Sequence, residues 1–339
     1  MPEQPQTPMR KSAMVGVVGR TNAGKSTVVN QMVGEKVSIV SPVEQTTRNT
    51  IRGIVDDLRG QLVLLDTPGL HKAVGPLGKL LNGMARATSA GVDILLVVFD
   101  VAHEPQLEDE GWMRRVVKEH PEKVVFALNK CDRSPFYETM FRDLWKEVST
   151  STTGSLPVGA GTTSTTGSLP VDAGTTSTTG SLPVEPRWVT CCGIRKGGCD
   201  ALLDVLYDLA APGPALFPED VVTDYPRKLA IADVVREKLI QRLRDEVPHE
   251  VGVAVKDLHE DRKRGWDVAV TIYVNRPSQK GIVIGPRGSL LKAVRLSAEP
   301  ELSDMFCVKV RLELWVKVEP NWMKNNRLLA EMGYLGATR

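Results

Sequence analysis

The sequence has no long hydrophobic run and few cysteines. Its longest purely aliphatic or aromatic run is Ile94 to Phe99, far short of the ~18 residues that a membrane-spanning helix needs. The beginning, MPEQPQTPMRKSA, lacks the apolar segment of a secretory signal. The five cysteines are odd in number and irregularly spaced, which argues against a disulfide framework and favours a reducing, cytoplasmic environment.

An excess of charge of either sign is also absent. Lysine and arginine total 43 against 41 acidic residues, so a nucleic-acid partner would have to be met by a local basic patch. Apolar residues make up 42% and charged residues 25%, which excludes a wholly disordered chain. A length of 339 residues favours two domains over one.

Apolar runs alternate with helical patterns in the first two thirds of the chain. The runs lie at 14–19, 61–69, 92–101 and 123–132, with a weaker fifth at 188–192. Val/Leu/Ile runs without polar alternation are typical of strands that are buried on both faces of a parallel sheet. Helix-like stretches at 76–90, 104–120 and 136–147 separate them. The pattern predicts an α/β domain with a doubly wound, mostly parallel sheet.

The composition changes at several points and sets the predicted domain boundaries. Residues 1–12 are polar and contain proline, so we expect a disordered tail before a first domain at 13–212. Within this domain, 149–185 is a low-complexity insertion in which GSLPV recurs with a spacing of 13 residues. We expect it to form a surface loop, with a small β-stack or a binding segment as the alternative. A proline-rich linker at 213–227 precedes a second domain at 228–339.

The second domain has a different pattern. An amphipathic helix at 228–247 is followed by alternating strands at 250–258 and 266–274. Then come a helix, a glycine turn and a helix within 278–299, a strand at 307–318 and a short helix at 321–332. The order α-β-β-α-α-β predicts a separate α+β domain.

The motif Gly19-Arg20-Thr21-Asn22-Ala23-Gly24-Lys25-Ser26 fits the phosphate-binding pattern G-x-x-x-x-G-K-[ST] between a strand and a helix. Its glycines allow backbone N–H groups to turn toward phosphates, and the helix N-terminus adds its dipole. Lys25 can bridge the β- and γ-phosphates, and the Ser26 hydroxyl can ligate Mg²⁺. A plain glycine-rich turn is the alternative for this motif considered alone.

Two further motifs follow apolar strands in the order that a guanine-nucleotide site requires. Asp66-Thr67-Pro68-Gly69 can hold the Mg²⁺ shell through Asp66 and contact a γ-phosphate through the Gly69 N–H. Asn129-Lys130-Cys131-Asp132 places a carboxylate where it can accept hydrogen bonds from guanine N1–H and the 2-amino group. Adenine offers no such pair of donors, so the sequence predicts a preference for guanine.

A basic glycine turn lies in the second domain. Gly285-Pro286-Arg287-Gly288 separates two helices, and a GxxG turn lets a sugar-phosphate backbone approach closely. Nearby basic residues include Lys280 and Lys292, and there is no acidic residue between Asp267 and Glu299. The turn therefore predicts RNA binding, with a purely structural helix–turn–helix as the alternative.

With these motifs in order, the chain resembles the Era family of bacterial GTPases. The matching phrases are GRTNAGKST, QTTR, DTPGLH, FPEDVVTD, VIGPRG and LELWVKV followed by Trp322, and the resemblance covers about 13–148 and 186–335. It implies a P-loop GTPase domain followed by a type II KH domain. It also implies binding near the 3′ end of 16S ribosomal RNA and a role in assembly of the small (30S) subunit.

The resemblance assigns roles to individual residues. Thr47 is similar to the switch threonine that completes the Mg²⁺ shell, and Asn22 is similar to an asparagine associated with potassium-stimulated hydrolysis. We expect Mg²⁺ at Ser26, Thr47 and Asp66, and catalytic roles for Lys25, Thr47 and Gly69. The expected nucleotide contacts are Gly19, Arg20, Thr21, Asn22, Ala23, Gly24, Lys25, Ser26, Thr27, Asp66, Thr67, Pro68, Gly69, Leu70, Asn129, Lys130, Cys131 and Asp132.

The expected RNA contacts are Gly285, Pro286, Arg287, Gly288, Lys280 and Lys292. We further expect a cytoplasmic monomer, and the family adds peripheral attachment to the cell membrane as a second location. Leu70 stands where many small GTPases have a catalytic glutamine, so turnover is expected to be slow. The alternative is an RNA-binding module with a GTPase fold and lost or very weak hydrolysis. A nucleotide kinase or ATPase with the same phosphate loop is a further rival.

The chain departs from the family pattern in the repeat and in the fifth nucleotide motif. That motif, ordinarily Ser-Ala, here falls at Thr190-Cys191-Cys192. We expect its backbone to contact the guanine and its thiols, with that of Cys199, to be buried rather than metal-bound. We expect Trp315 and Trp322 to pack in the core, with RNA stacking as the alternative.

Overall fold

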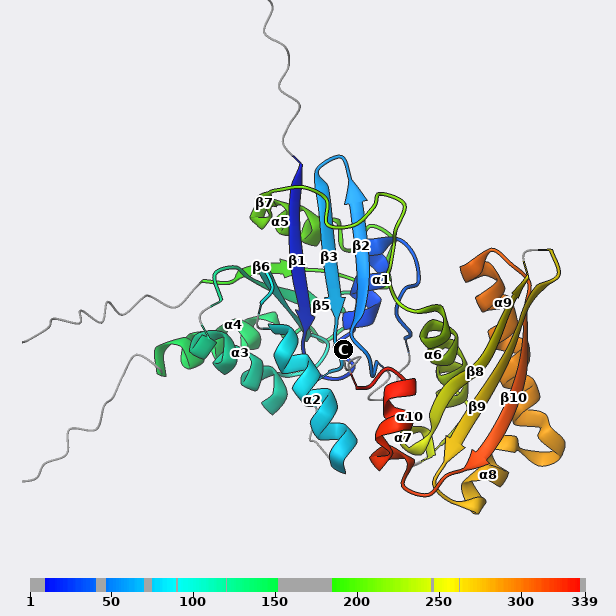
Figure 1. Ribbon diagram of the computed structural model, residues 1–339. Coiled ribbons are helices and arrows are strands. Elements are labelled where there is room, and N and C mark those ends of the chain that lie inside the picture. Colours follow the sequence, from blue (N-terminus) through cyan, green and yellow to red (C-terminus); the bar gives the residue numbers. More distant parts are fainter. Residues whose placement is uncertain are drawn as a thin grey trace, which may run out of the picture.

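The computed structural model describes residues 10–40, 47–69, 75–89, 91–119, 121–151, 185–244, 247–261 and 263–335, and within these ranges the chain forms two sheets with helices packed against them (Figure 1). In the same ranges, the larger sheet has seven strands in the order β2-β3-β1-β4-β5-β6, with β7 paired to β1. The strands are β1 (Lys11–Val18), β2 (Ile51–Asp57), β3 (Gly60–Asp66), β4 (Ile94–Asp100), β5 (Val124–Asn129), β6 (Arg187–Thr190) and β7 (Ala211–Pro212).

Most neighbouring strands of this sheet are parallel. β1 pairs in parallel with β3 and β4, and β5 pairs in parallel with β4 and β6. β2 and β7 are the antiparallel additions, to β3 and β1 respectively. Every residue of β4 and β5 is buried, which explains their uninterrupted apolar sequence. The predicted doubly wound, mostly parallel sheet is confirmed.

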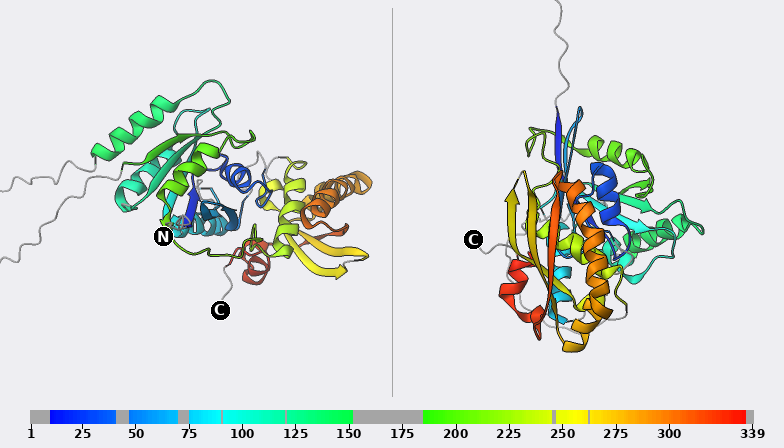
Figure 2. Two further views of the ribbon diagram at one scale, coloured as in Figure 1. Left: turned by 90° about the horizontal axis from the view of Figure 1, so that it is seen from above. Right: turned by 90° about the vertical axis from the view of Figure 1, so that its right-hand side faces the viewer.

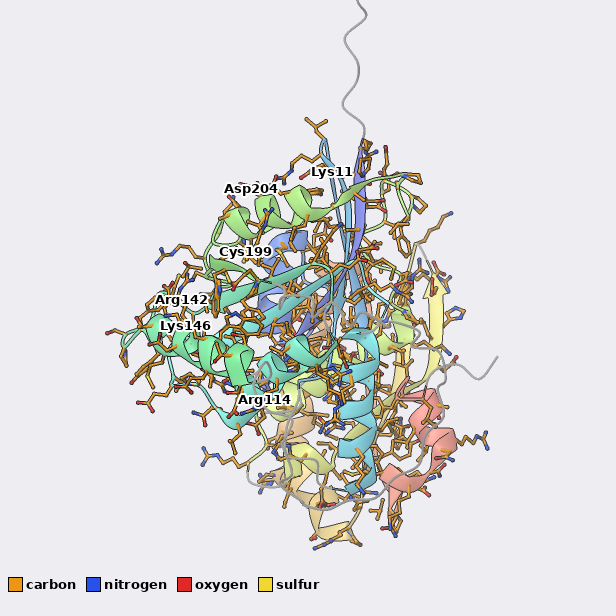
Figure 3. The ribbon with its side chains drawn as sticks, turned by 90° about the vertical axis from the view of Figure 1, so that its left-hand side faces the viewer. Lys11, Arg114, Arg142, Lys146, Cys199 and Asp204 are labelled. Carbon is orange, nitrogen blue, oxygen red and sulfur yellow. The ribbon has the colours of Figure 1, made fainter. Side chains whose placement is uncertain are left out.

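Helices cover both faces of the sheet (Figure 2). One face carries α1 (Lys25–Val33) and α5 (Asp200–Leu209). The other carries α2 (Gly75–Ser89), α3 (Leu107–Glu119) and α4 (Glu138–Ser151), which pack aromatic side chains such as Trp112 and Phe141 against the sheet. Figure 3 shows charged side chains on the outer sides of α3 and α4, at Arg114, Arg142 and Lys146.

The second unit is built on a smaller sheet with the order β10-β9-β8. β9 pairs antiparallel with β8 and parallel with β10, and α6, α8 and α9 cover one face through residues such as Val235, Val283 and Val294. The element order is that expected of a type II KH domain, and this part of the predicted fold is also confirmed. The elements are α6 (Arg227–Ile240), α7 (Val247–Glu250), β8 (Gly252–Asp261), β9 (Gly265–Val274), α8 (Pro277–Ile284), η1 (Pro286–Gly288), α9 (Ser289–Phe306), β10 (Val310–Val318), η2 (Trp322–Lys324) and α10 (Asn326–Glu331).

Several predicted elements have different bounds in the structure. The helix predicted at 228–247 starts at Arg227, inside the predicted linker, and ends at Ile240, where the chain turns toward β8. The strand predicted at 307–318 begins only at Val310, because Cys307 ends α9 with a φ of +51°. The helix predicted at 321–332 is divided, because the Asn325 side chain accepts hydrogen bonds from two backbone N–H groups and starts α10 anew.

The first domain also differs from its prediction in where it begins and in two elements that the sequence pattern did not reveal. The tail predicted at 1–12 is wrong for its last residues, because β1 begins at Lys11, where pairing with Gly60 draws these polar residues into the sheet. β2 and α5 were not predicted. The GSLPV repeats of the predicted 149–185 insertion all lie outside the described residues, and α4 continues to Ser151, just inside that insertion.

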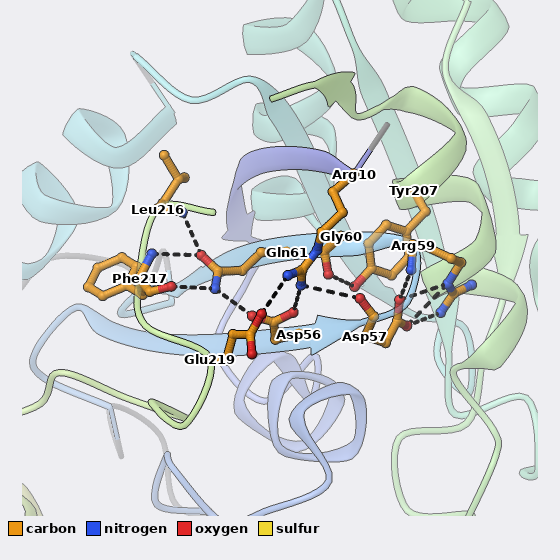
Figure 4. Close-up of polar contacts among 10 residues, drawn as sticks. All are labelled: Arg10, Asp56, Asp57, Arg59, Gly60, Gln61, Tyr207, Leu216, Phe217 and Glu219. Carbon is orange, nitrogen blue, oxygen red and sulfur yellow. Dashed lines mark hydrogen bonds and ion pairs between the residues drawn. The ribbon is translucent and has the colours of Figure 1, made fainter. Parts of the chain in front are cut away.

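The segment predicted as a linker contacts Gln61 near the start of β3 and then the edge strand β2. The backbone N–H groups of Leu216 and Phe217 both donate to Gln61 Oε1 at 2.8 Å (Figure 4). Further along, the Ile54 N–H donates to the Val222 carbonyl at 2.9 Å. The chain between the two units is therefore held against the sheet by hydrogen bonds to Gln61 of β3 and Ile54 of β2.

The two units also contact each other through α2. Leu77 and Leu81 of this helix pack with Trp322, Leu329 and other apolar residues of η2 and α10. The helix that follows the second nucleotide motif thus rests on the C-terminal segment of the KH domain. This contact buries apolar side chains from both units in one cluster.

Candidate functional site

The phosphate-binding loop lies between β1 and α1, as its motif predicted. Gly24 caps α1 with a φ of +91°, and a Cβ there would lie 2.3 Å from Asn129 Nδ2. Glycine is therefore required at this position by both backbone conformation and space. The first N–H groups of α1 face the loop without a capping side chain, which is the arrangement that binds anions.

Lys25 is buried at the base of the loop. Its Nζ donates to the Arg20 carbonyl at 2.9 Å, and its side chain is only 6% exposed. Burial lowers the pKa of Lys25 to about 8, and the nearby Asp66 carboxylate opposes this shift. A phosphate beside Lys25 would stabilise its charged form.

Three oxygen-bearing side chains meet beside the loop. Ser26 Oγ lies 2.8 Å from Thr47 Oγ1, so the threonine from the segment after α1 reaches the first residues of that helix. The Asp66 carboxylate is fully buried, and neither of its oxygens has a hydrogen-bond partner within the described ranges. Burial raises the pKa of Asp66, and the nearby Ser26 hydroxyl and Lys25 ammonium oppose this shift although neither makes a hydrogen bond of normal geometry to the carboxylate. An orphaned carboxylate next to two hydroxyls fits Mg²⁺, which prefers oxygen ligands.

The turn after β3 closes against the phosphate loop. Thr67 Oγ1 donates to the Val17 carbonyl at 2.8 Å, and a Cβ on Gly69 would lie 2.7 Å from the Thr21 backbone N. Leu70, the next predicted contact, lies outside the described residues. The resulting cleft brings together the first two motifs and Thr47, and it is lined by Thr21, Asn22, Gly24, Lys25, Ser26, Thr27, Ile39, Val40, Thr47 and Gly69.

The third motif is tied directly to the phosphate loop. Asn129 Nδ2 donates to the Ala23 carbonyl at 2.9 Å, and Asn129 Oδ1 accepts from the Gly193 N–H at 3.1 Å. Lys130 Nζ donates to the Asn22 carbonyl at 2.7 Å. Asn129 therefore links the phosphate loop to the loop after β6, and the three motifs form one site.

Asp132 stands at the exposed edge of this site. The Cys192 thiol donates to Asp132 Oδ1 at 3.2 Å, and this bond holds the pKa of the carboxyl below its usual value. Burial and the same carboxylate raise the pKa of the Cys192 thiol, which keeps it a donor. The altered fifth motif therefore supplies a side chain that orients the predicted guanine-reading carboxylate.

Two buried aspartates beneath the site were missed by the sequence reasoning. Asp100 Oδ2 binds Lys130 Nζ at 2.7 Å and lies 3.3 Å from Arg20 Nη2. Asp109 lies 3.2 Å from Arg20 Nε, and burial raises the pKa of Asp109 to about 6. The available signal was weak: Asp100 directly follows an apolar run, and Arg20 occupies a variable position of its motif.

The predicted RNA-binding residues form a separate site on the hairpin of α8 and α9. Gly285 has a φ of +73°, and a Cβ there would lie 2.8 Å from Leu290 Cβ, so the turn requires glycine. Arg287 also has a positive φ, of 51°, and is exposed at the turn. Lys280 and Lys292 are exposed on the flanking helices, and Pro286 and Gly288 complete the turn.

The remaining candidates are resolved by burial. Cys191, Cys192 and Cys199 are buried, as predicted. In the described part of the chain, no group of three or more metal-ligating side chains lies together. Figure 3 marks Cys199 at the start of α5. Trp322 is fully buried, as predicted, whereas Trp315 is 62% exposed, so its predicted core role is wrong. It points to the sheet face opposite the one that Leu312 and Val316 bury.

None of the described helices is long and apolar enough to cross a membrane.

Comparisons with known proteins agree with this arrangement. A family model described as a 50S ribosome-binding GTPase matches residues 14–130, and a KH domain model matches 246–323. The chain is 35% identical to the GTPase Era of Geobacter sp. (strain M21), over 96% of this chain and 98% of that protein. It is also 35% identical to the GTPase Era of Rippkaea orientalis, over 96% of this chain and 92% of the relative.

Two solved structures are similar over nearly the whole chain. A point variant of Aquifex aeolicus Era bound to GDP and AlF4− superposes with a TM-score of 0.79 at 28% identity, covering 96% of this chain and 99% of that chain. An Era complex with MgGDPNP and nucleotides 1506–1542 of 16S ribosomal RNA superposes with a TM-score of 0.80, at the same identity and coverage. The similarity includes both units of the fold.

Proposed function

Because the chain belongs to the Era family of GTPases, we propose that it hydrolyses GTP with Mg²⁺ to control binding of its KH domain to 16S ribosomal RNA. The RNA segment proposed is the one near the 3′ end, and the role proposed is assistance in 30S subunit assembly. The observation that carries the nucleotide part is the meeting of Ser26 and Thr47 hydroxyls, 2.8 Å apart, beside the orphaned Asp66 carboxylate.

The residues of the cleft take complementary roles in this proposal. Mg²⁺, held by Ser26, Thr47 and the Asp66 region, would neutralise charge on the phosphates. Lys25 holds the β- and γ-phosphates and stabilises charge that develops between them. The Gly69 N–H donates to the γ-phosphate, so that hydrolysis releases both Gly69 and Thr47. Loss of these contacts is an order–disorder switch of the kind used by other GTPases.

Base recognition falls to the third motif. Asp132 is ionised and exposed, with Cys192 bound to one of its oxygens. Each carboxylate oxygen has two acceptor lone pairs, so Oδ1 can keep the thiol and still accept a guanine N–H. Asn129 and Lys130 fix the loop, while Cys131 and the remaining predicted contacts of Gly19 to Thr27 surround the nucleotide.

The rate of hydrolysis is proposed to be low without a partner. Leu70 offers no group to orient water, so turnover should fall near the uncatalysed small-GTPase scale, on the order of 10⁻⁴ s⁻¹. Asn22, with a φ of +60° in the phosphate loop, is the residue proposed to mediate stimulation by potassium. RNA bound at the KH domain is the proposed second stimulus.

The RNA part of the proposal is supported by the exposed turn and by the relative's complex. Arg287 protrudes between Gly285 and Gly288, and Lys280 and Lys292 flank it. The similar Era structure holds nucleotides 1506–1542 of 16S ribosomal RNA. We propose the same class of ligand here, for a monomer acting in the cytoplasm, with peripheral membrane attachment as a second location. With β1 beginning at Lys11 and α6 at Arg227, the proposed domains are 11–212 and 227–339, joined by 213–226.

Calorimetry with the full chain tests the nucleotide part. In Mg²⁺ buffer, GDP should bind at least a hundredfold more tightly than ADP, and single-turnover assays in saturating K⁺ should convert bound GTP to GDP. Equal binding of GDP and ADP would overturn the guanine assignment. Persistent intact GTP would instead favour an RNA-binding module without turnover.

A further inference from the structure

Arg48, the residue after the proposed magnesium ligand Thr47, contacts the KH domain through its side chain. Arg48 follows Thr47, and its side chain is only 1% exposed. Arg48 Nη1 donates to the Val251 carbonyl and Nη2 to the His249 carbonyl, both at 3.0 Å. The guanidinium also lies over the Tyr334 ring, 5.9 Å from its centroid. Thr47 and Arg48, the switch segment, are therefore attached to the KH domain by an arginine that is almost inaccessible to solvent.

This attachment has energetic consequences. The charge of Arg48 is removed from water, because the residue is only 1% exposed. A buried charge is tolerated only while its hydrogen bonds are made. If Thr47 leaves the magnesium site and carries Arg48 with it, the 249–251 segment must either follow or lose both bonds. Movement of Thr47 and Arg48 is thus costly unless the 249–251 segment moves with them.

The 249–251 segment, which Arg48 binds, also contacts α8, the helix that leads to the RNA-binding turn at Gly285–Gly288. Between the two carbonyls lies Glu250, whose side chain accepts hydrogen bonds from Gln279 Nε2 and, at 3.4 Å, from Asn275 Nδ2. Gln279 Oε1 in turn accepts from the N–H groups of Asn275 and Arg276 at 2.9 and 3.0 Å, and so caps α8. Glu250 therefore anchors the first turn of α8.

The far end of α8 carries the turn itself. The helix spans Pro277–Ile284, and Gly285 follows directly. An eight-residue helix is a rigid rod of about 12 Å at 1.5 Å per residue. A shift or rotation imposed on its first turn is therefore passed to Gly285–Gly288. Connected contacts run from Thr47 through Arg48, the 249–251 backbone and Glu250 to this turn.

We propose that Arg48 and Glu250 are positioning residues that couple the nucleotide state of Thr47 to the RNA-binding turn. Arg48 transmits the position of the switch segment to 249–251, and Glu250 transmits that of 249–251 to α8. Coupling of two binding sites is reciprocal, so RNA at the turn would stabilise Thr47 at the magnesium site by the same factor. This inference rests on the proposed function, since it requires that the turn bind RNA.

The test measures coupling and not activity alone. The affinity of the full chain for an RNA of nucleotides 1506–1542 of 16S ribosomal RNA is measured with GDP and with MgGDPNP. For the unaltered chain, we expect the two RNA dissociation constants to differ by roughly 5- to 150-fold, the usual range of allosteric coupling. The reciprocal experiment measures the factor by which RNA raises the affinity for MgGDPNP and the factor by which it raises the affinity for GDP, and the quotient of these two factors should equal the same ratio.

Variants of Glu250 then separate the relay from a structural role. Glu250→Ala should bring the ratio to within about twofold of unity, with GDP affinity in the absence of RNA unchanged. Glu250→Gln keeps an acceptor for Gln279 and should restore most of the ratio. Glu260→Ala is the matched control, because Glu260 lies on β8 but pairs with Arg227 at 2.8 Å, away from α8. It should leave the ratio unaltered.

Arg48→Lys tests the other end of the relay. A single ammonium cannot reproduce the two-pronged bond of a guanidinium to two carbonyls, so the ratio should again fall. If Glu250→Ala keeps the full ratio, or weakens RNA binding equally in both nucleotide states, the relay is wrong while RNA binding by the KH domain stands. If the unaltered chain does not bind the RNA at all, the proposed function fails, and the relay with it.

Discussion

Replacement of Asp132 by asparagine should change which base the protein binds. The carboxylate is exposed, and its only orienting side chain is the Cys192 thiol at 3.2 Å, as far as the described residues show. An asparagine oxygen can keep that thiol bond, so the loop should retain its shape. The second oxygen, however, becomes an amide NH₂, which faces a guanine donor with another donor.

The size of the effect follows from the hydrogen bonds lost. Two charge-assisted bonds from guanine are worth about 3–6 kcal/mol together, which is roughly 10²- to 10⁴-fold in affinity. Xanthine carries a carbonyl where guanine has its 2-amino group, so the new NH₂ matches it. Asp132→Asn should therefore lose GDP affinity by up to that factor, since one acceptor oxygen remains, and should bind XDP more tightly than GDP.

Calorimetry of GDP, XDP and ADP binding in Mg²⁺ buffer is the assay. Arg133→Ala is the control, because Arg133 is the exposed neighbour of Asp132, and its charge favours the ionised carboxylate without replacing any acceptor oxygen. It should leave the preference for GDP intact. If Asp132→Asn still prefers GDP to XDP, the assignment of Asp132 as the guanine reader is refuted.

Three further changes give distinct outcomes. Gly69→Ala places a Cβ 2.7 Å from the Thr21 backbone N. Such overpacking costs about 1–3 kcal/mol, so a titration with GDP should show weaker nucleotide binding while the KH domain stays folded. Cys192→Ala should lower the affinity for GDP and the ratio of GDP affinity to IDP affinity, whereas Cys192→Ser should retain both. If the alanine variant and the unaltered chain gave the same ratio, the orienting role of the thiol would be contradicted. Burial raises the pKa of Asp109 from 3.8 to about 6, among Arg20, Asp100 and Glu108, so its contribution to stability is fully present below pH 3.8 and is lost as pH rises through 6. Asp109→Asn should remove a pH dependence of about 3 kcal/mol, measured by urea unfolding from pH 4 to 7, and identical pH profiles would rule this out.

Much of the GTPase domain could be predicted because its strands are buried on both faces. Such strands need uninterrupted apolar residues, and β4 and β5 are buried at every position. β2 escaped prediction because it is an antiparallel edge strand interrupted by exposed Arg52. The Cys307 cap also gave no signal, since an alternating apolar pattern does not reveal a positive φ.

The nucleotide motifs could be predicted because phosphate binding imposes strict local spacing. A turn that aims backbone N–H groups at a phosphate needs glycine at fixed positions, and Gly24 confirms that need with its φ of +91°. The wrong prediction for Trp315 shows the limit of reasoning from local pattern. Alternation assigns a residue to one of two sheet faces, and only packing decides which face is covered.

The order of the two folds and the chemistry of each motif can be read from the amino-acid sequence, because secondary structure and phosphate loops depend on neighbours along the chain. Contacts between distant segments appear only in the folded protein. Nothing in the sequence around Arg48 indicates that it binds the carbonyls of His249 and Val251, about 200 positions away. Likewise, the Cys192 thiol reaches Asp132 only after β5 and β6 pair. Such contacts depend on how whole elements pack, and packing is a property of the folded chain.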